Sequence, residues 1–299
     1  MSVAYQKPME RSELRFLNAL EKCHAVLDAA WEAGVRHFDA ARSYGKSESF
    51  LANWLRKRRI APGDVAVTTK WGYTYTAKWR VDTGGEPHEV KEHSVANLRR
   101  QTEETAELLG DYVKLYQVHS ATLESGFLNE DVLEELRSIK ALRGWRIGLT
   151  LSGTGQADTL RETLKRAPGV FDCVQATYNL LEQSVGDALT EARDAGLDVI
   201  IKEAMANGRV LRSSAVQSAA AELGVPPDAL ALAAALCLPC RPVVLSGAAN
   251  AAHLASNVEA LRAYEALRGD GGARLSSLLA AAAVAPHAYW AERGALAWN

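Results

Sequence analysis

The chain has 299 residues, of which 48% are hydrophobic and 23% are charged, a composition that fits a globular protein with a sizeable core. Its net charge of −2 gives no electrostatic case for nucleic acid or an anionic membrane as a partner. No apolar run is long enough to cross a bilayer, and the polar N-terminus does not resemble a signal peptide, so we expect a cytoplasmic protein.

The four cysteines are too few and too scattered for a secreted disulfide scaffold, which favours a reducing compartment. Two of them form the CxxC motif Cys237–Cys240. A redox or metal role for this motif would need a helix N-terminus or a second ligand pair nearby. The motif instead closes an alanine- and leucine-rich helical run, so we interpret it as two structural thiols and expect no metal site.

Apolar strand candidates alternate with amphipathic helices from about residue 35 onwards. The predicted strands cover residues 35–41, 64–70, 112–119, 145–151, 171–178, 198–204 and 242–248. The predicted helices cover residues 20–33, 46–59, 90–109, 129–142, 155–167, 183–195 and 227–238, where apolar residues recur at three- and four-residue spacing. This alternation predicts one α/β domain over residues 1–299, with a parallel sheet surrounded by helices.

Seven strands can be counted, whereas a closed TIM-type (β/α)8 barrel needs eight. The missing strand should precede the helix at 20–33, within residues 1–19, which are polar and charged and offer only residues 2–5 as a strand. We therefore predict a barrel whose first strand is weak or missing, at an atypical or truncated N-terminus. Residues 269–299 are expected to add a helix and a tail over one barrel mouth, carrying Tyr289, Trp290 and Trp298.

Four polar residues stand at or just beyond the ends of the first three predicted strands: Asp39, Tyr44, Lys70 and His119. Enzymes with TIM barrels carry their chemistry at this end of the strands. A free phenol has a pKa of about 10, and a nearby ammonium and imidazole would favour its ionised form and ease proton transfer. Taken singly, these residues could be a buried ion pair and a core histidine. Together they predict a site for acid–base chemistry.

With these segments in place, the chain resembles the aldo-keto reductases over roughly residues 20–260. The resemblance is carried by five segments in order: VRHFDAARSYGKSESFLANWL, VAVTTKWG, LGDYVKLYQVHSA, FDCVQATYNLLEQ and VVLSGAANAAHLASNVEAL. It implies a barrel enzyme that reduces an aldehyde or ketone to an alcohol, or catalyses the reverse, by hydride transfer. The implied cofactor is NADP(H), with NAD(H) as the alternative. Tyr44 would be the general acid or base, and Asp39, Lys70 and His119 would be its catalytic partners.

The resemblance also implies contacts to the nicotinamide. Gln175 and Thr150 would hydrogen-bond its carboxamide. Lys202 stands where many relatives place an aromatic ring. It would either reach a phosphate or simply extend its long stem out of the strand end.

The other end of the cofactor would be held by the segment after the last predicted strand. Ser246 and Gly247 would let the backbone approach a phosphate, next to a helix N-terminus. Asn250 and Asn257 would donate hydrogen bonds there. The charged residue that many relatives use is absent, which weakens the expected preference for NADPH.

Aromatic residues follow Lys70 closely, and we expect Trp71 and Tyr73 to bind a small carbonyl or alcohol substrate in an apolar pocket. The alternative is that at least two rings of this loop pack it against the barrel. Two other functions would use the same fold. One is a cofactor-independent isomerase or dehydratase that uses Tyr44, Lys70 and His119, and the other is a non-catalytic subunit.

Overall fold

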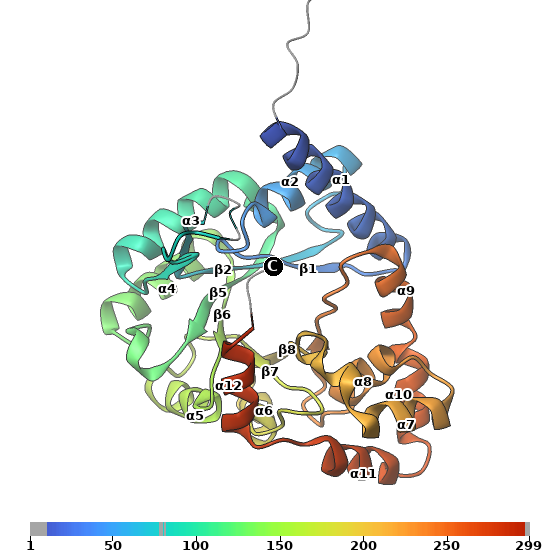
Figure 1. Cartoon of the computed structure of the whole chain (residues 1–299). Coiled ribbons are helices and arrows are strands. Elements are labelled where there is room, and N and C mark those ends of the chain that lie inside the picture. The colour runs from blue at the N-terminus through green and yellow to red at the C-terminus, as the bar shows by residue number, and fades with distance from the viewer. Residues whose placement is uncertain (1–10, 78–79, 81, 297–299) are drawn as a thin grey trace, which may run out of the picture.

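The computed structural model describes residues 11–77, 80 and 82–296, with side chains from residue 18 onwards. Seven parallel strands form one curved sheet in the order β1-β2-β5-β6-β7-β8-β9 (Figure 1). They are β1 (His37–Asp39), β2 (Ala66–Trp71), β5 (Val113–Ala121), β6 (Arg146–Leu151), β7 (Cys173–Thr177), β8 (Asp198–Lys202) and β9 (Val243–Val244). All seven predicted strands are therefore confirmed.

The sheet stays open, because β1 and β9 are its two edges and no described strand lies between them. It curls into a half-barrel around the position where a closed barrel has its axis (Figure 1). The strand that residues 2–5 were expected to supply lies outside the described residues.

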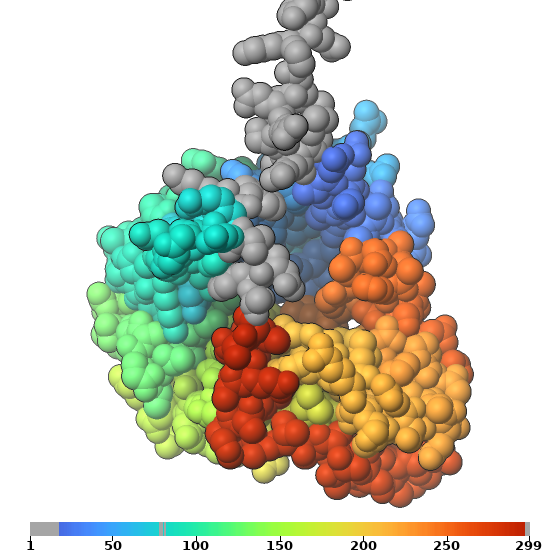
Figure 2. All heavy atoms as spheres, viewed as in Figure 1, coloured from blue at the N-terminus to red at the C-terminus, as the bar shows by residue number. Residues whose placement is uncertain are grey.

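The helices of the described chain are α1 (Arg11–Glu32), α2 (Ser47–Arg58), α3 (Val95–Leu109), α4 (Glu130–Arg143), α5 (Gln156–Arg166), α6 (Gly186–Asp194), α7 (Ser214–Leu223), α8 (Pro227–Leu236), α9 (Ala251–Val258), α10 (Ala260–Arg268), α11 (Ala273–Ala282) and α12 (Pro286–Gly294). Helices α1 to α6 lie around the outside of the curved sheet (Figure 1). Helix α12 instead lies in front of the strands, at the surface of the face that Figure 2 shows. Three short 3-10 turns complete the chain: Gly110–Tyr112, Leu123–Ser125 and Ala206–Arg212.

The strand side chains alternate between two different environments, as the twofold period of a strand requires. On the outer face, Tyr116, Ile147 and Val174 belong to the main hydrophobic core beneath the helices. On the inner face, Leu115 and Cys173 pack with Ile200 in a small cluster of their own. Residues two positions further along each strand therefore face the barrel interior nearer its mouth.

The segment after β2 differs from the prediction. Instead of a loop running into a helix at residue 90, a short antiparallel pair forms between β3 (Tyr73–Tyr75) and β4 (Glu89–Lys91). Helix α3 begins only at Val95, because Ser94 caps it by accepting a hydrogen bond from the backbone N–H of Asn97 at 3.2 Å.

The C-terminal segment also differs from the prediction, since it forms two helices, α11 and α12, where one helix and a tail were expected. Pro286 opens α12, a position that proline favours because it lacks a backbone N–H. Tyr289 is fully buried in a second hydrophobic cluster with Val210 and Leu230, and Trp290 packs against this cluster. Trp298 lies outside the described residues.

Helices α7 and α8 contribute six of the fifteen buried residues of that second cluster. Within the described part of the chain, no single helix is long and apolar enough to cross a membrane. Only α7 and α8 taken as a pair meet the length and composition required, and they meet at a bend of 92°. The CxxC motif follows α8 directly, with Cys240 buried and a raised pKa caused by that burial.

Candidate active site

Polar side chains fill the inner face of the sheet at the carboxyl ends of its strands. Because side chains alternate along a strand, residues two positions apart face the same side of the sheet. From β1 to β8 the polar side chains are Asp39, Lys70, His119, Thr150, Gln175 and Lys202, all predicted from the sequence. The structure thus brings six of the predicted residues to one mouth of the half-barrel.

Lys70 is completely buried and forms an ion pair with the Asp39 carboxylate. Its ammonium also donates to the carbonyl oxygen of Ala40 at 2.9 Å. Burial opposes the charge of Lys70, but the Asp39 carboxylate outweighs it, and the pKa of Lys70 is raised. The same carboxylate accepts hydrogen bonds from Thr68 Oγ1 at 2.6 Å and Gln175 Nε2 at 3.3 Å. The predicted pair therefore exists and is held by one further residue of β2 and by one residue of β7.

Tyr44 follows β1 and extends towards this pair. Its hydroxyl lies 3.5 Å from Nε2 of His119, and the Lys70 ammonium lies 5.1 Å from the centre of its ring. Half of the residue is exposed, while its hydroxyl end reaches into the mouth. Burial raises the pKa of Tyr44, and Lys70 lowers it by less, so the net shift is upwards. Lys70 therefore acts in the expected direction, but Tyr44 remains a protonated phenol at neutral pH.

His119 is aimed into the mouth by a β-bulge. Val118 pairs with Leu149 but Ala121 pairs with Leu151, so β5 contains one residue more than β6 here. Ser120 adopts a φ of 53°, which is uncommon for a residue other than glycine. Its backbone N–H donates to Thr150 Oγ1 at 2.8 Å, which fixes the distorted segment.

The His119 ring lies between two tyrosines. The ring centres of Tyr44 and Tyr73 are 5.5 Å and 5.0 Å away, both in edge-to-face geometry. Nδ1 of His119 is 3.3 Å from Ser43 Oγ. Burial lowers the pKa of His119 well below its usual value, and the charges of Lys70 and Lys202 lower it further. A neutral imidazole is thus available as a hydrogen-bond partner for the Tyr44 hydroxyl.

The two aromatic residues expected to bind substrate take different positions. Tyr73 reaches the mouth, and the Gln101 side chain donates to its carbonyl oxygen at 2.8 Å. Trp71 is fully buried in the main core, with its ring centre 5.3 Å from that of His93. Trp71 therefore packs inside the protein, which was the alternative to substrate binding for the rings of this loop.

His93 supports the site from behind and was not predicted to do so. Its Nε2 donates to the carbonyl oxygen of His119 at 3.0 Å. Burial lowers the pKa of His93 to about 4, helped by the Lys91 charge, so the ring is neutral at physiological pH. A side chain at Gly72 would collide with it, because a Cβ there would lie 2.4 Å from His93 Cδ2. Only the folded chain shows this contact, since His93 and His119 are 26 residues apart.

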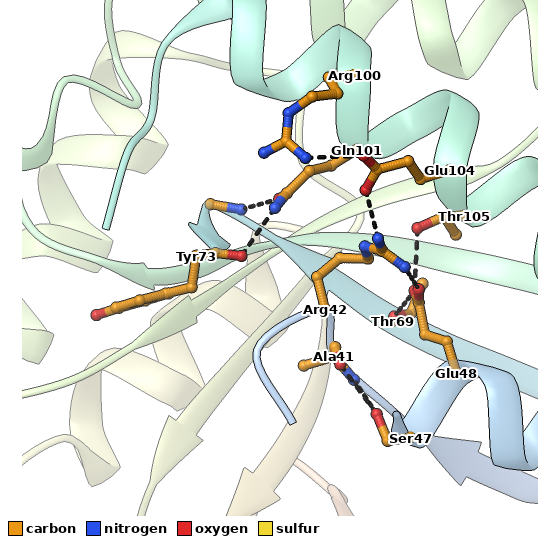
Figure 3. Close-up of polar contacts among 11 residues, drawn as sticks. Ala41, Arg42, Ser47, Glu48, Thr69, Tyr73, Arg100, Gln101, Glu104 and Thr105 are labelled. Atoms are coloured by element: carbon orange, nitrogen blue, oxygen red, sulfur yellow. Dashed lines mark hydrogen bonds and ion pairs between the residues drawn. The ribbon is translucent and has the colours of Figure 1, made fainter. Parts of the chain in front are cut away.

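A second unpredicted network holds the loop that carries Tyr44 (Figure 3). Arg42 bridges two acidic side chains, Glu48 at 2.6 Å and Glu104. Glu48 is buried and also accepts from Thr69 at 2.6 Å and Thr105 at 3.0 Å. The loop is thereby tied to α2, α3 and β2 at once. A cavity of about 470 Å³ opens beside this network, lined by residues that include Arg42, Tyr73 and Arg100.

Lys202 lies across the mouth from Lys70 and has a different environment. Its ammonium donates to Thr177 Oγ1 at 2.9 Å, and its distance to the Glu203 carboxylate is 3.9 Å. Burial lowers the pKa of Lys202 to about 8, and Glu203 only partly offsets that effect. No aromatic ring occupies this position, as the sequence indicated.

The segment after β9 places the remaining predicted residues. Ser246 and Gly247 are exposed, and within the described chain the backbone N–H groups of residues 246–250 donate to no protein acceptor. Asn250 caps α9 by accepting from the backbone N–H of His253 at 2.8 Å. Asn257 is buried, and its amide accepts from Ser246 Oγ at 2.8 Å and donates to the Asp228 carboxylate at 3.1 Å. Asn257 therefore holds Ser246 in place from below.

Comparison with known proteins agrees with this geometry. The model of the aldo/keto reductase family matches residues 16–267, which is most of the chain. The chain belongs to this family. The aldo-keto reductase AKR11C1 from Bacillus halodurans, solved in its holo form, superposes with a TM-score of 0.69 at 20% identity, over 90% of each chain. The predicted barrel fold is thereby confirmed.

Two relatives align over different lengths of the chain. The aldo-keto reductase str7 of Strobilurus tenacellus is 39% identical over 75 residues, which is 25% of this chain and 20% of that protein. D-threo-aldose 1-dehydrogenase of a Pseudomonas species is 27% identical over 233 residues, covering 70% of this chain and 68% of that enzyme. The chain thus spans a fifth of the first relative and about two thirds of the second.

Proposed function

We propose that this aldo-keto reductase is an NAD(P)H-dependent oxidoreductase that interconverts a small carbonyl compound and its alcohol. The observation that carries the proposal is the arrangement of Tyr44, His119 and the Asp39–Lys70 pair at the mouth of the family's barrel. The relative named as an aldose dehydrogenase supports hydride chemistry on a carbonyl or hemiacetal carbon.

In this proposal, Tyr44 is the general acid. Its raised pKa keeps the phenol protonated at neutral pH, so it can give its proton to a carbonyl oxygen. The phenolate that results is stabilised by the Lys70 ammonium, 5.1 Å from the ring centre. Asp39 keeps that ammonium charged and fixed in position. A bound nicotinamide cofactor would supply the hydride in reduction and accept it in oxidation.

Neutral His119 has a positioning role in this proposal. Its Nε2 accepts the Tyr44 hydroxyl hydrogen bond while substrate is absent, and the bulge and the hydrogen bond from His93 hold the His119 backbone in place. Because its pKa is far below neutral, His119 adds no positive charge that would compete with Lys70 for the phenolate. Tyr73, on the other side of the ring, borders the space left for substrate.

The residues present fit a nicotinamide cofactor in two respects. The unpaired backbone N–H groups of residues 246–250, next to the N-terminus of α9, form a donor set suited to a phosphate group. At the mouth, the Gln175 amide and the Thr150 hydroxyl are suited to hydrogen-bond a carboxamide. Lys202 borders the same space. His253 is the one ionisable residue in the first turn of α9. Because no lysine or arginine stands there to bind the additional phosphate of NADPH, this turn fits NADH about as well as NADPH.

Titration of the purified full chain with NADPH and NADH, followed by quenching of its tryptophan fluorescence, tests this proposal. We expect saturable quenching by at least one cofactor. A Gly247→Val variant, which restricts the exposed loop, should weaken binding, and a Val258→Thr variant at the far end of α9 should not. If neither cofactor binds the wild-type chain, the proposal is wrong.

A further inference from the structure

Lys202 is a largely buried lysine whose nearest carboxylate in the described chain, Glu203 at 3.9 Å, is shared with a second cation, Arg293. Among the described residues, its one hydrogen bond is to the Thr177 hydroxyl at 2.9 Å. An ammonium carries three N–H donors, so two of them find no acceptor within hydrogen-bond distance in the described chain. A buried ammonium in this situation is costly, and the cost falls when the group loses its proton.

The neighbouring carboxylate is already engaged elsewhere. Glu203 lies 3.9 Å from Lys202, but its Oε1 accepts from Arg293 of α12 at 3.1 Å. The hydroxyl of Tyr289 donates to the other oxygen at 3.4 Å. The charge of Glu203 is therefore shared with a guanidinium that also repels Lys202.

The backbone at this point is in an unusual conformation. Glu203 has a φ of 54°, in the left-handed region that residues other than glycine rarely adopt. This turn places two consecutive side chains, Lys202 and Glu203, near one another, whereas an extended strand would direct them to opposite faces. Such conformations are concentrated at functional sites, because the surrounding structure must offset their cost.

The Lys202 side chain also has access to the mouth. It lies on the inner face of β8, two residues beyond Ile200, and 16% of its side chain is exposed. The charged groups that act on it are Glu203 and Asp39, which favour its ammonium form, and Arg293 and Lys70, which oppose it. A small molecule that enters the mouth can therefore reach an amine that readily gives up its proton.

We propose that Lys202 is a nucleophilic amine that binds small aldehydes covalently, as an imine, at the mouth of the half-barrel. The neutral amine attacks the carbonyl carbon, a C–N bond forms, and the carbonyl oxygen takes up a proton to give a carbinolamine. The C–O bond then breaks, and the oxygen leaves as water with the two hydrogens that the amine nitrogen loses overall. The products are the imine and one water, with no oxidant or reductant. This site does not depend on a nicotinamide cofactor.

Trapping the imine in the wild-type full chain tests this proposal directly. The protein is incubated with glycolaldehyde and sodium cyanoborohydride, which reduces imines and spares aldehydes, at pH 7 without nicotinamide, and the reduced adducts are located by peptide mass spectrometry. With a pKa of about 8, Lys202 has roughly two hundred times the free-amine fraction of an ordinary lysine at pH 7. A less basic amine is also a weaker nucleophile, so we expect labelling at Lys202 to be about tenfold faster than at an exposed lysine.

Lys165 is the internal reference, because its side chain is 70% exposed and forms an exposed ion pair with Glu162. Lys202→Met should abolish the fast labelling, and Lys165→Met should leave it intact. The proposal is overturned if Lys202 is unlabelled in the wild-type chain, or is labelled no faster than Lys165. Because the wild-type chain alone can give either result, a poorly folded variant does not obscure it.

Discussion

Two regions of the mouth hold a lysine in similar places and give it opposite properties. On the β1–β2 side, Lys70 is buried and its pKa is raised. On the β7–β8 side, burial lowers the pKa of Lys202 to about 8. Burial acts on both in the same direction, so the difference comes from their carboxylates. Asp39 contacts Lys70 and the neutral side chains of Thr68 and Gln175, whereas Glu203 is shared between Lys202 and a second cation, Arg293.

The largest expected effect tests whether the β1–β2 side carries the proposed catalysis. Tyr44→Phe removes the phenolic proton and should lower kcat for carbonyl reduction by about 10²–10⁴-fold, the range of general acid catalysis. Nicotinamide binding, measured by fluorescence, should be unchanged, because Tyr44 contacts His119 and Lys70 and not the segment after β9. A variant that keeps more than a tenth of the wild-type kcat would exclude Tyr44 as the acid.

A matched pair of substitutions tests, through the free energy of unfolding, whether the two lysines differ in their ion pairs. Lys70→Met leaves the Asp39 carboxylate without its cation, and we expect a loss of about 3–5 kcal/mol in the free energy of unfolding. Lys202→Met removes an ammonium that is 3.9 Å from the Glu203 carboxylate and leaves Glu203 paired with Arg293 at 3.1 Å. Its effect should be less than about 1 kcal/mol in either direction. Urea unfolding of both variants measures this, and equal losses would contradict the different roles of the two carboxylates.

Most of the fold could be predicted from the sequence because buried parallel strands leave a strong local signal. All of β7 and most of β5 are buried, so both strands show as short runs in which apolar residues predominate. The β3–β4 pair could not be predicted, since both strands have three residues and depend on the loop closing between Tyr75 and Glu89.

The site was predictable only in part, for a similar reason. Asp39, Lys70 and His119 stand at strand ends, where the barrel topology alone brings them together. The contacts that hold the Tyr44 loop and set the environment of Lys202 join residues far apart in the chain: Glu104 reaches Arg42 across 62 residues, and Arg293 reaches Glu203 across 90. No local sequence pattern predicts such contacts. The upward shift of the Tyr44 pKa was likewise not expected, because burial of the hydroxyl depends on the folded mouth.

Acid unfolding tests how much stability depends on His93, which donates a hydrogen bond to the backbone carbonyl of His119 in β5. His93, behind it, has a pKa of about 4 in the folded chain and about 6.5 when unfolded. The unfolded state binds the proton more readily, so this stability is present above pH 6.5 and is lost as the pH falls to about 4. The loss from His93 alone should be about 3 kcal/mol.

Unfolding in urea at a series of pH values measures this loss. In His93→Asn, the side-chain amide can still donate towards the His119 carbonyl but does not titrate. This variant should be less stable at pH 7 and show a shallower fall in acid. An identical pH slope in both proteins would rule out His93 as a source of the acid sensitivity.

The smallest expected effect concerns the cation that distinguishes the β7–β8 side. Arg293→Leu removes a charge that repels Lys202 and also releases Glu203 to pair with it. Both changes favour the ammonium, so the pKa of Lys202 should rise by about one unit, and, since the more basic amine is also the better nucleophile, aldehyde labelling at pH 7 should fall by only about threefold. Arg293→Lys keeps the charge and should keep most of the labelling, and Arg262→Leu, which breaks an exposed pair with Glu259, should not affect it. If Arg293→Leu leaves the labelling rate and its pH midpoint unchanged, then the shared carboxylate does not explain why the two lysines differ.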